Sequence, residues 1–339
     1  MTQHAVQRFE TASGVQIFQL PLLAFPENFW VYAYLVVSGE YRILVDTGSG
    51  FGESNRCLLD GLVQASRMAG IPLAPANLTH VLLTHGHIDH YGGASFLREQ
   101  TSALFGVHEL DARILSRYEE RLMVSARRLG IFLTEAGVME PRRTKLLAMY
   151  RDTKALFRAT PVDFTFETIG MTLGPLRFCH VPGHSAGHVL IRIDDLLLAG
   201  DHVLNGITPH MAPEHLTLST GLAHYLHSLE VAKQWAGDVR LTLSGHKTPI
   251  ENLAARADAI RAEHHARLQQ ILSLLQTPMT INEVSHALFN TVRGYNVLLA
   301  LEETGAHVEY LYQRGEICIE NLSALESDTP QPIRYMCSG

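Results

Sequence analysis

The hydrophobic positions along the chain group into two kinds of segment. Residues 15–22, 30–39 and 41–50 are rich in β-branched and aromatic residues and are separated by Pro, Gly and Asn, which is typical of β-strands. Residues 53–69 have a helical pattern instead, and a short apolar run at 79–85 predicts a buried strand. Because strands and a helix alternate here, the sequence predicts a layered α/β fold.

The middle of the chain interrupts this alternation. Residues 108–163 have a helical period and carry eleven Lys and Arg against eight Asp and Glu. Strands are then expected over 163–183, 188–201 and 239–246. The sequence therefore predicts a helical insertion at about 108–163 within a catalytic domain that spans residues 1–250.

The pattern changes again after Pro249, where helices follow one another. Residues 252–276 and 295–305 are expected to be helical. Thr280 with Glu283 three residues later is a capping-box signature, which predicts the start of another helix between them.

Residues 306–322 alternate like a β-hairpin with its turn near Arg314-Gly315. Three helices followed by a hairpin are the order of a winged helix. We therefore expect a winged-helix-like module over 251–325 and a loose tail over 326–339.

Composition and charge narrow the class of protein. The chain has 339 residues, of which 46% are hydrophobic and 18% charged, and its net charge is −7, as expected of a globular protein that does not coat nucleic acid along its length. No apolar run approaches the roughly 18 residues of a membrane span. The first residues do not have the basic-then-apolar pattern of a signal peptide.

The cysteines indicate which cellular compartment to expect. No C-x-x-C pair is present, and the four residues are scattered: Cys57, Cys179, Cys318 and Cys337. They are interpreted as reduced thiols, which predicts a cytoplasmic protein.

Three histidines and an aspartate crowd into residues 85–90, directly after an apolar run. His85 and His87 can point at one centre if the loop curls around it, and Asp89 and His90 can reach a second centre close by. Imidazole and carboxylate groups suit zinc, and also iron or manganese. Taken alone, the cluster is also compatible with a polar loop.

Three later strands also run into a residue of the ligand type. His184 follows a Pro-Gly turn, and Asp201 and His246 each follow a Gly. Strand ends are where α/β proteins gather their functional residues. Four such junctions in one chain favour a metal site over a polar loop.

With these residues the sequence resembles the metallo-β-lactamase superfamily of hydrolases. The H-x-H-x-D-H motif stands at 85–90, and the later ligands match His184, Asp201 and His246. The resemblance covers about residues 15–250. The C-terminal part resembles the tail of the glyoxalase II-like and lactamase-β-like branch. The resemblance implies an αββα sandwich with a two-metal site at one edge.

The resemblance also implies a role for each site residue. The first metal would be bound by His85, His87 and His184, the second by Asp89, His90 and His246, and both by Asp201. The cofactors would be two divalent ions, with zinc preferred over iron or manganese, and a hydroxide bridging them would attack the substrate. Asp89 is also the candidate catalytic residue, which would orient the nucleophile or carry its proton. Asp46 and Thr84 are expected to support the ligands from behind.

The expected substrate is a small molecule with an activated ester, above all a thioester of the acyl-CoA or acyl-glutathione type. A bridging aspartate such as Asp201 is typical of the thioesterase, lactonase, phosphodiesterase and nuclease branches. A nuclease or phosphodiesterase acting on RNA or DNA, and a lactonase or β-lactamase-like hydrolase, stay as alternatives. Nucleic acid is disfavoured because residues 251–321 carry five Lys and Arg against nine Asp and Glu.

Contacts to the substrate are less defined. Asn205, His210 and Tyr225 follow the bridging aspartate and are candidates, although packing or local hydrogen bonds explain each of them as well. An anionic substrate would suit the basic residues of the insertion, which are otherwise the solvated faces of helices: Arg127, Arg128, Arg142, Arg143 and Lys145. The C-terminal module would pack on the core, form a homodimer or close the pocket.

Overall fold

The computed structural model describes residues 4–338. The chain divides into two units. The first unit comprises the residues up to 118, 158–209 and 228–257, and the second comprises 119–157, 210–227 and the residues from 258 on. Residues 119–157 of the expected insertion therefore group with the C-terminal helices, while all seven expected metal ligands belong to the first unit.

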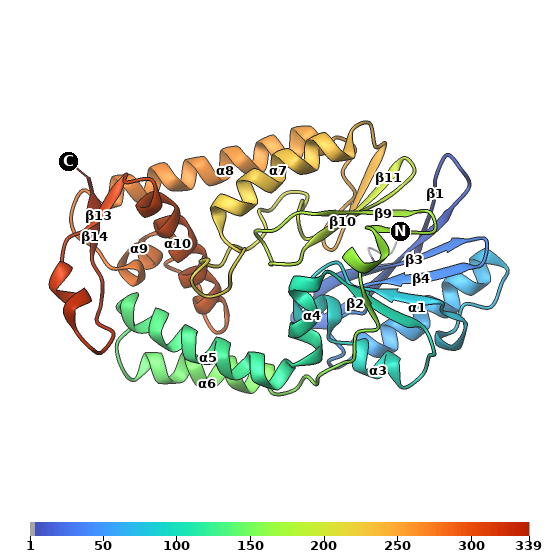
Figure 1. Cartoon of the computed structure of the whole chain (residues 1–339), viewed down its shortest axis with the longest axis horizontal. Helices are drawn as coiled ribbons and strands as arrows, with labels where there is room; N and C mark the ends of the chain where they lie inside the picture. Colours follow the sequence, from blue (N-terminus) through green and yellow to red (C-terminus); the bar gives the residue numbers. More distant parts are fainter. Residues whose placement is uncertain (1–3, 339) are drawn as a thin grey trace. The chain divides into compact units, whose positions relative to one another are not determined.

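A seven-stranded sheet in the first unit has its strands in chain order, and Figure 1 labels the first four of them, β1 to β4. Its strands are β1 (Gln7–Glu10), β2 (Gln16–Phe25), β3 (Phe29–Ser38), β4 (Tyr41–Val45), β5 (His80–Leu82), β6 (Leu104–Val107) and β7 (Phe164–Thr165). The pairs from β1 to β4 are antiparallel, and those from β4 to β7 are parallel. Because β4 and β5 run in the same direction, the segments that follow them, which carry Asp46 and His85, leave the sheet at the same edge.

A second sheet of five strands has the order β12-β11-β10-β9-β8. Its strands are β8 (Thr172–Leu173), β9 (Leu176–His180), β10 (Val189–Ile193), β11 (Leu196–Gly200) and β12 (Leu241–Ser244). Strands β11 and β12 are parallel, whereas the other pairs are antiparallel. Asp201 and His246 therefore follow the parallel strands at one edge, and His184 lies in the loop between β9 and β10.

The two sheets pack face to face. Their shared core contains apolar residues of both, such as Ile17 and Val36 from the first sheet and Ile191 and Leu198 from the second. The other face of the first sheet packs on helices α1 (Ser54–Ala69) and α3 (Ala94–Arg98), through residues such as Leu58, Leu62 and Leu97. Strands buried on both faces are continuous apolar runs, as the sequence showed.

Helix α7 (Leu222–Ala236) forms the outer layer of the second sheet through its first-unit residues. Leu229, Ala232 and Ala236 of this helix are buried. Arg192 of β10 donates from Nη1 to the backbone carbonyl of Ala236 at 2.9 Å. Short 3-10 turns, η1 (Pro75–Asn77) and η2 (Glu167–Ile169), complete the connections of this unit. The layers give the predicted αββα sandwich.

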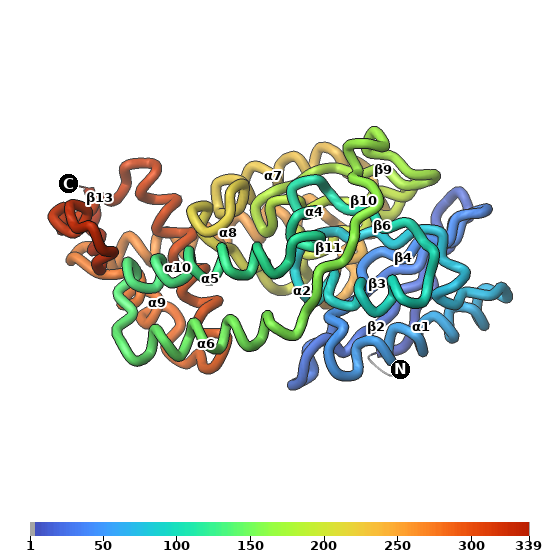
Figure 2. Tube along the Cα trace, turned by 60° about the horizontal axis from the view of Figure 1, so that its bottom comes forward, coloured from blue at the N-terminus to red at the C-terminus, as the bar shows by residue number. Residues whose placement is uncertain are grey.

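The expected insertion is helical in the structure. It contains α4 (Glu109–Ser116), α5 (Tyr118–Glu135) and α6 (Arg142–Lys154). Helices α5 and α6 lie side by side in both views (Figures 1 and 2). Arg143 of α6 donates from Nη1 to Thr134 Oγ1 of α5 at 2.8 Å, which joins the two helices.

The C-terminal residues contain α8 (Leu253–Leu274), α9 (Ile281–Leu288) and α10 (Asn296–Gln313). The predicted capping box is present at the start of α9. Glu283 Oε2 accepts from the backbone N–H of Thr280 at 2.7 Å, and Thr280 Oγ1 accepts from the backbone N–H of Glu283 at 3.3 Å.

The hairpin predicted over 306–322, and the helix end predicted at Gly305, are wrong. Helix α10 continues to Gln313, because Leu301, Val308 and Leu311 recur at helical spacing and are buried. A short strand, β13 (Ile317–Ile319), pairs instead with β14 (Tyr335–Cys337), with the 3-10 turn η3 (Leu322–Glu326) between them. The segment expected to be a loose tail thus contains a strand, and the winged-helix-like character of the module stays a prediction.

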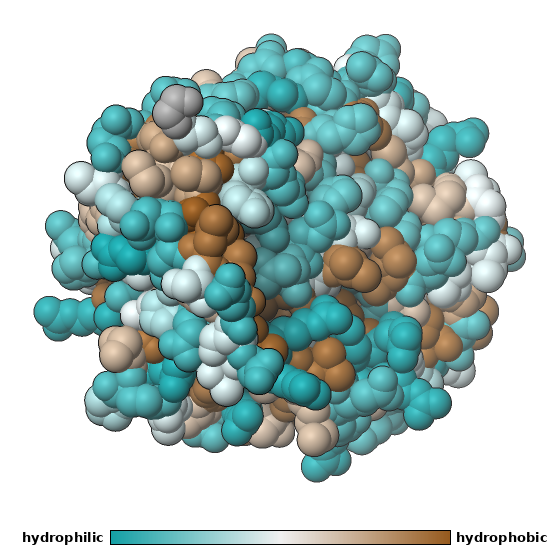
Figure 3. Space-filling model, turned by 60° about the vertical axis from the view of Figure 1, so that its left-hand side comes forward, coloured by the Kyte–Doolittle hydropathy of each residue, from teal (hydrophilic) through white to brown (hydrophobic). Residues whose placement is uncertain are grey.

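The described surface is mixed in character. On the face shown in Figure 3, hydrophobic residues form small patches separated by hydrophilic ones. No helix between residues 4 and 338 combines the length and the apolar composition that crossing a bilayer requires.

Candidate metal centre

The H-x-H-x-D-H segment leaves β5 as a tight turn. His85 and His87 stand on the turn itself, and the one-turn helix α2 (Ile88–Tyr91) carries Asp89 and His90. The backbone N–H of His90 donates to the carbonyl of His87 at 3.0 Å, which closes the turn. Ile88 is buried between the polar residues and anchors the segment in the protein.

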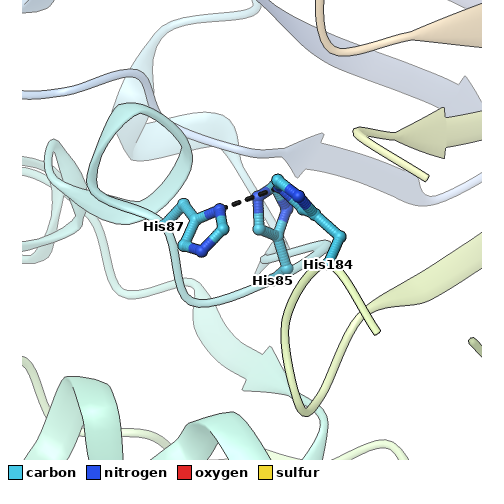
Figure 4. Close-up of side chains that lie close together, drawn as sticks. All are labelled: His85, His87 and His184. Carbon is cyan, nitrogen blue, oxygen red and sulfur yellow. Dashed lines mark hydrogen bonds between the residues drawn. The ribbon is translucent and has the colours of Figure 1, made fainter. Parts of the chain in front are cut away.

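Three histidines form the first group of side chains, shown in Figure 4. One ring nitrogen each of His85, His87 and His184 lies within 4.8 Å of the other two. His87 Nδ1 is 2.9 Å from His184 Nε2. Since His184 comes from the loop after β9, the two sheets meet in this group.

Two carboxylates and two imidazoles form the second group: Asp89, His90, Asp201 and His246. His246 Nε2 lies 3.2 Å from Asp89 Oδ2 and 3.2 Å from Asp201 Oδ2. Asp201 Oδ1 lies 3.4 Å from His90 Nε2, while its Oδ2 lies 3.9 Å from His184 Nε2 of the first group. Asp201 therefore stands between the two groups, and all seven expected ligands come together.

Hydrogen bonds behind the imidazoles determine which nitrogen faces the centre. Asp46 Oδ2 lies 2.8 Å from His90 Nδ1 and 2.8 Å from Thr84 Oγ1, so both donate to it. The hydroxyl proton of Thr84 is thereby used, and His85 Nδ1, at 3.0 Å, must donate to Thr84 Oγ1. His246 Nδ1 donates to the carbonyl of Trp30 at 2.6 Å. In the neutral form each of these three rings presents the Nε2 lone pair to the centre.

Buried polar atoms without partners support the same conclusion. Among the described residues, His85 Nε2, His90 Nε2 and Asp201 Oδ1 are buried and have no hydrogen-bond partner. Leaving such atoms unpaired in a protein interior is costly unless something else binds them. Imidazole and carboxylate donors in these numbers fit a divalent transition-metal ion.

A family model described as the metallo-β-lactamase superfamily matches residues 30–274. The chain belongs to the metallo-β-lactamase superfamily. It is thus a superfamily hydrolase with a His/Asp metal-binding cluster.

Relatives and solved structures agree with this assignment. The chain is 24% identical over 292 residues to "Probable metallo-hydrolase YqjP" of Bacillus subtilis, covering 83% of this chain and 87% of the relative. It is 29% identical over 187 residues to hydroxyacylglutathione hydrolase of Shewanella halifaxensis, covering 55% of this chain and 51% of that protein. The structure of a metallo-β-lactamase family protein from Thermus thermophilus superposes with a TM-score of 0.73 at 27% identity, covering 95% of this chain and 98% of the other.

The backbone of this metallo-β-lactamase fold is strained behind the ligands. Asp46 has φ of 63°, a left-handed conformation that costs a non-glycine residue free energy. Its Oδ1 accepts from the backbone N–H of Thr84 at 2.8 Å, in addition to the two bonds to Oδ2. Asp46 and Thr84 thus lie behind the expected ligands, and their supporting role stays a prediction.

The buried histidines and aspartates of the centre have shifted pKa values. Burial and the neighbouring imidazoles, His90 first, hold the pKa of His85 well below its usual range, so the ring is neutral, which is the form in which an imidazole can bind a metal ion. Burial opposes the charge on Asp201, but His246 and His90 outweigh it and hold the pKa of the carboxyl well below its usual range. Burial also opposes the charge on His246, but the carboxylates of Asp201 and Asp89 outweigh it and raise the pKa of His246 to about 10. The carboxylates therefore draw positive charge into the centre.

The candidate substrate contacts have protein partners of their own. Asn205, in the first unit, donates from Nδ2 to Thr248 Oγ1 at 2.8 Å. In the second unit, His210 Nε2 is 3.1 Å from the carbonyl of Leu299, and the fully buried Tyr225 meets the ring of His264 edge-on with centroids 5.6 Å apart. Their contact with substrate stays a prediction.

Two residues near the centre were not expected as ligands, and the structure shows hydrogen bonds from both of them to the segments that carry the expected ligands. His188 Nε2 accepts from the backbone N–H of Asp201 at 3.1 Å, and its ring stacks on His85 with centroids 4.7 Å apart. Asp111, at the start of the expected insertion, is fully buried beside the ligand loops. No motif in the sequence marks Asp111, because two of its three partners are backbone N–H groups, which every residue type except proline provides.

Proposed function

We propose that the chain is a dinuclear metal-dependent hydrolase that cleaves an activated ester, with a thioester of the acyl-CoA or acyl-glutathione type as substrate. The observation that carries this proposal is the position of Asp201 between two ligand groups. His85, His87 and His184 would bind one ion, Asp89, His90 and His246 a second, and Asp201 both. Zinc is the preferred metal, because imidazole and carboxylate suit it.

Two divalent ions at such a centre would lower the pKa of a bound water to near neutrality and polarise the carbonyl of the ester. The chain itself supplies the geometry. Asp89 is partly exposed, with 16% of its side chain accessible, so among the carboxylates it is the one placed to orient an incoming water and take its proton. The buried His85 and His90 keep their positions through Thr84 and Asp46.

The names of relatives favour the thioester over other esters. Hydroxyacylglutathione hydrolase acts, by its name, on a glutathione thioester. The chain spans about half of that protein, so its substrate is carried over as a proposal. A cytoplasmic location is proposed with it, because the four cysteines are free thiols in the structure.

Metal analysis tests the centre. The purified full chain should contain close to two transition-metal ions, and Asp201→Ala should lose metal and bring activity to background. Asp238→Ala is the matched control, because its side chain is 97% exposed. Retention of full metal content by Asp201→Ala would refute the ligand assignment.

An assay panel tests the substrate class. Acyl-CoA, acyl-glutathione, a lactone, a β-lactam and single-stranded RNA are compared with one preparation, with His87→Ala as the inactive reference. The proposal expects thioester cleavage to exceed the others and to vanish in His87→Ala. Faster cleavage of RNA, lactone or β-lactam that also vanishes in His87→Ala would replace the thioester by that substrate.

A further inference from the structure

The carboxylate of Asp111, on helix α4, lies between the two loops that carry the first histidine group. Asp111 is fully buried. Its Oδ2 accepts from the backbone N–H of Gly86 at 2.7 Å, and its Oδ1 accepts from the backbone N–H of Gly187 at 3.0 Å. Ser185 Oγ adds a third bond to Oδ2 at 3.2 Å. One side chain thus holds both loops.

The hydrogen-bond partners of Asp111 are sequence neighbours of the three histidines of the first group. Gly86 stands between His85 and His87, and Ser185 directly follows His184. We infer that Asp111 is a positioning residue, which sets the spacing between His184 and the His85-His87 pair and thereby the affinity of the first metal site. This inference rests on the proposed function, since it presupposes that the three histidines bind a metal ion.

Both glycines lie where residues of α4 leave little room for a side chain. A Cβ atom at Gly187 would lie 2.7 Å from Asp111 Cγ, and one at Gly86 would lie 2.8 Å from Ile114 Cδ1 and 3.2 Å from Asp111 Cγ. Neither glycine has a positive φ, so close approach rather than backbone conformation explains both. The sequence between the ligands is therefore fitted to a side chain that lies in another element.

A second contact from the same helix supports this arrangement. His108 is the N-cap of α4, and its ring stacks on His180 with centroids 3.8 Å apart. His180 Nε2 in turn donates to the carbonyl of Ala186 at 2.8 Å. The start of α4 therefore contacts the loop of His184 through two residues, Asp111 directly and His108 by way of His180.

A carboxylate is needed here because it has two acceptor atoms and no donor. In Asp111→Asn, the amide NH2 would face the backbone N–H of Gly86 or Gly187, so one loop would be released while the volume stays the same. Removing a hydrogen-bond partner of a metal-ligand assembly typically weakens metal binding by about 10–100-fold. Ser185→Ala removes only the weakest of the three bonds and leaves both loops attached.

The experiment measures Zn²⁺ and Co²⁺ affinity of the full chain by chelator competition, together with the visible absorption of bound Co²⁺ and the urea unfolding of the metal-free protein. Asp111→Asn should bind the ion of the first site about 10–100-fold more weakly, with altered Co²⁺ absorption. Gly187→Ala should do the same. Ser185→Ala should change affinity by less than about 3-fold, and the exposed Asp60→Asn on α1 should match the wild type.

The outcomes separate the two proposals. If Asp111→Asn is less stable but binds Co²⁺ with wild-type affinity and absorption, Asp111 is only structural and the inference is refuted. If Asp111→Asn fails to fold, Gly187→Ala decides in the same way. If Asp201→Ala also keeps wild-type metal binding, the metal centre itself is wrong, and the proposed function fails with the inference.

Discussion

Asp46→Ala should be among the most destabilising substitutions in the chain. Asp46 is buried, and its carboxylate accepts from His90 Nδ1, Thr84 Oγ1 and the backbone N–H of Thr84, each at 2.8 Å. Alanine leaves these donors without an acceptor in the interior, where one orphaned donor costs about 1–3 kcal/mol.

The backbone adds to this cost. At φ of 63°, alanine lacks the local stabilisation that Asp and Asn find in the left-handed region, at about 1 kcal/mol. With three donors at the lower end of that range and the backbone cost added, we expect Asp46→Ala to lower the free energy of unfolding by at least about 4 kcal/mol. Asp46→Asn keeps the tolerated conformation and one acceptor, so its cost should be about 1–3 kcal/mol.

The assay is urea unfolding of the metal-free protein, so that metal loss does not contribute to the difference. Asp60→Ala, exposed on α1, is the control and should stay within about 0.5 kcal/mol of the wild type. The slope against urea should be the same for all variants. A cost below about 2 kcal/mol for Asp46→Ala, or equal costs for the two Asp46 variants, would refute the reasoning.

Two further predictions concern the second unit. Thr280→Ala removes the capping box of α9 and should cost about 1 kcal/mol in urea unfolding, whereas the exposed Thr291→Ala should cost much less; equal costs would contradict the role of the cap. Burial lowers the pKa of His264 to about 2 and that of His307 to about 3, against 6.5 for an ordinary histidine. Each neutral ring therefore contributes stability that is complete above pH 6.5 and is lost as the pH falls, at about 1.4 kcal/mol per pH unit. His264→Asn removes the contribution of His264 to this pH dependence. The difference in free energy of unfolding between wild type and variant should therefore shrink by about 2 kcal/mol from pH 6.5 to pH 5. A difference that stays constant over this range would contradict a lowered pKa of His264.

That the side chains of the candidate metal centre gather could be predicted from the sequence, because each of them follows an apolar strand. Parallel strands bring their carboxyl ends to one edge of a sheet, which places His85 after β5 in the first sheet and Asp201 and His246 after β11 and β12 in the second. The packing of the two sheets then brings these edges together. The layered α/β class followed from the alternation of strands and helices, which needs only local pattern and the rules of sheet assembly. The αββα sandwich itself was expected from the resemblance to the superfamily.

Other features depend on contacts that no local pattern contains. Residues 306–313 alternate in hydrophobicity and also fit a helix, and the burial of Val308 and Leu311 within the second unit decides for α10. Asp111 looks like an ordinary charge on a polar helix, and only the fold brings it to Gly86 and Gly187. The grouping of residues 119–157 with those after 258 is likewise a property of the folded chain.

Strand β3, near the start of the chain, binds the segment around His246, which is synthesised much later. The backbone N–H of Tyr32 donates to Gly245 at 2.7 Å, the hydroxyl of Tyr34 to the carbonyl of Ser244 at 2.6 Å, and His246 to Trp30, which is 216 residues away. A ribosome adding about 5–20 residues per second needs on the order of tens of seconds to cover that distance. For most of this time the H-x-H-x-D-H segment is already synthesised but lacks His246, its last proposed ligand. A nascent chain stopped before residue 246 should therefore hold metal weakly, and the complete centre should be acquired only late in synthesis.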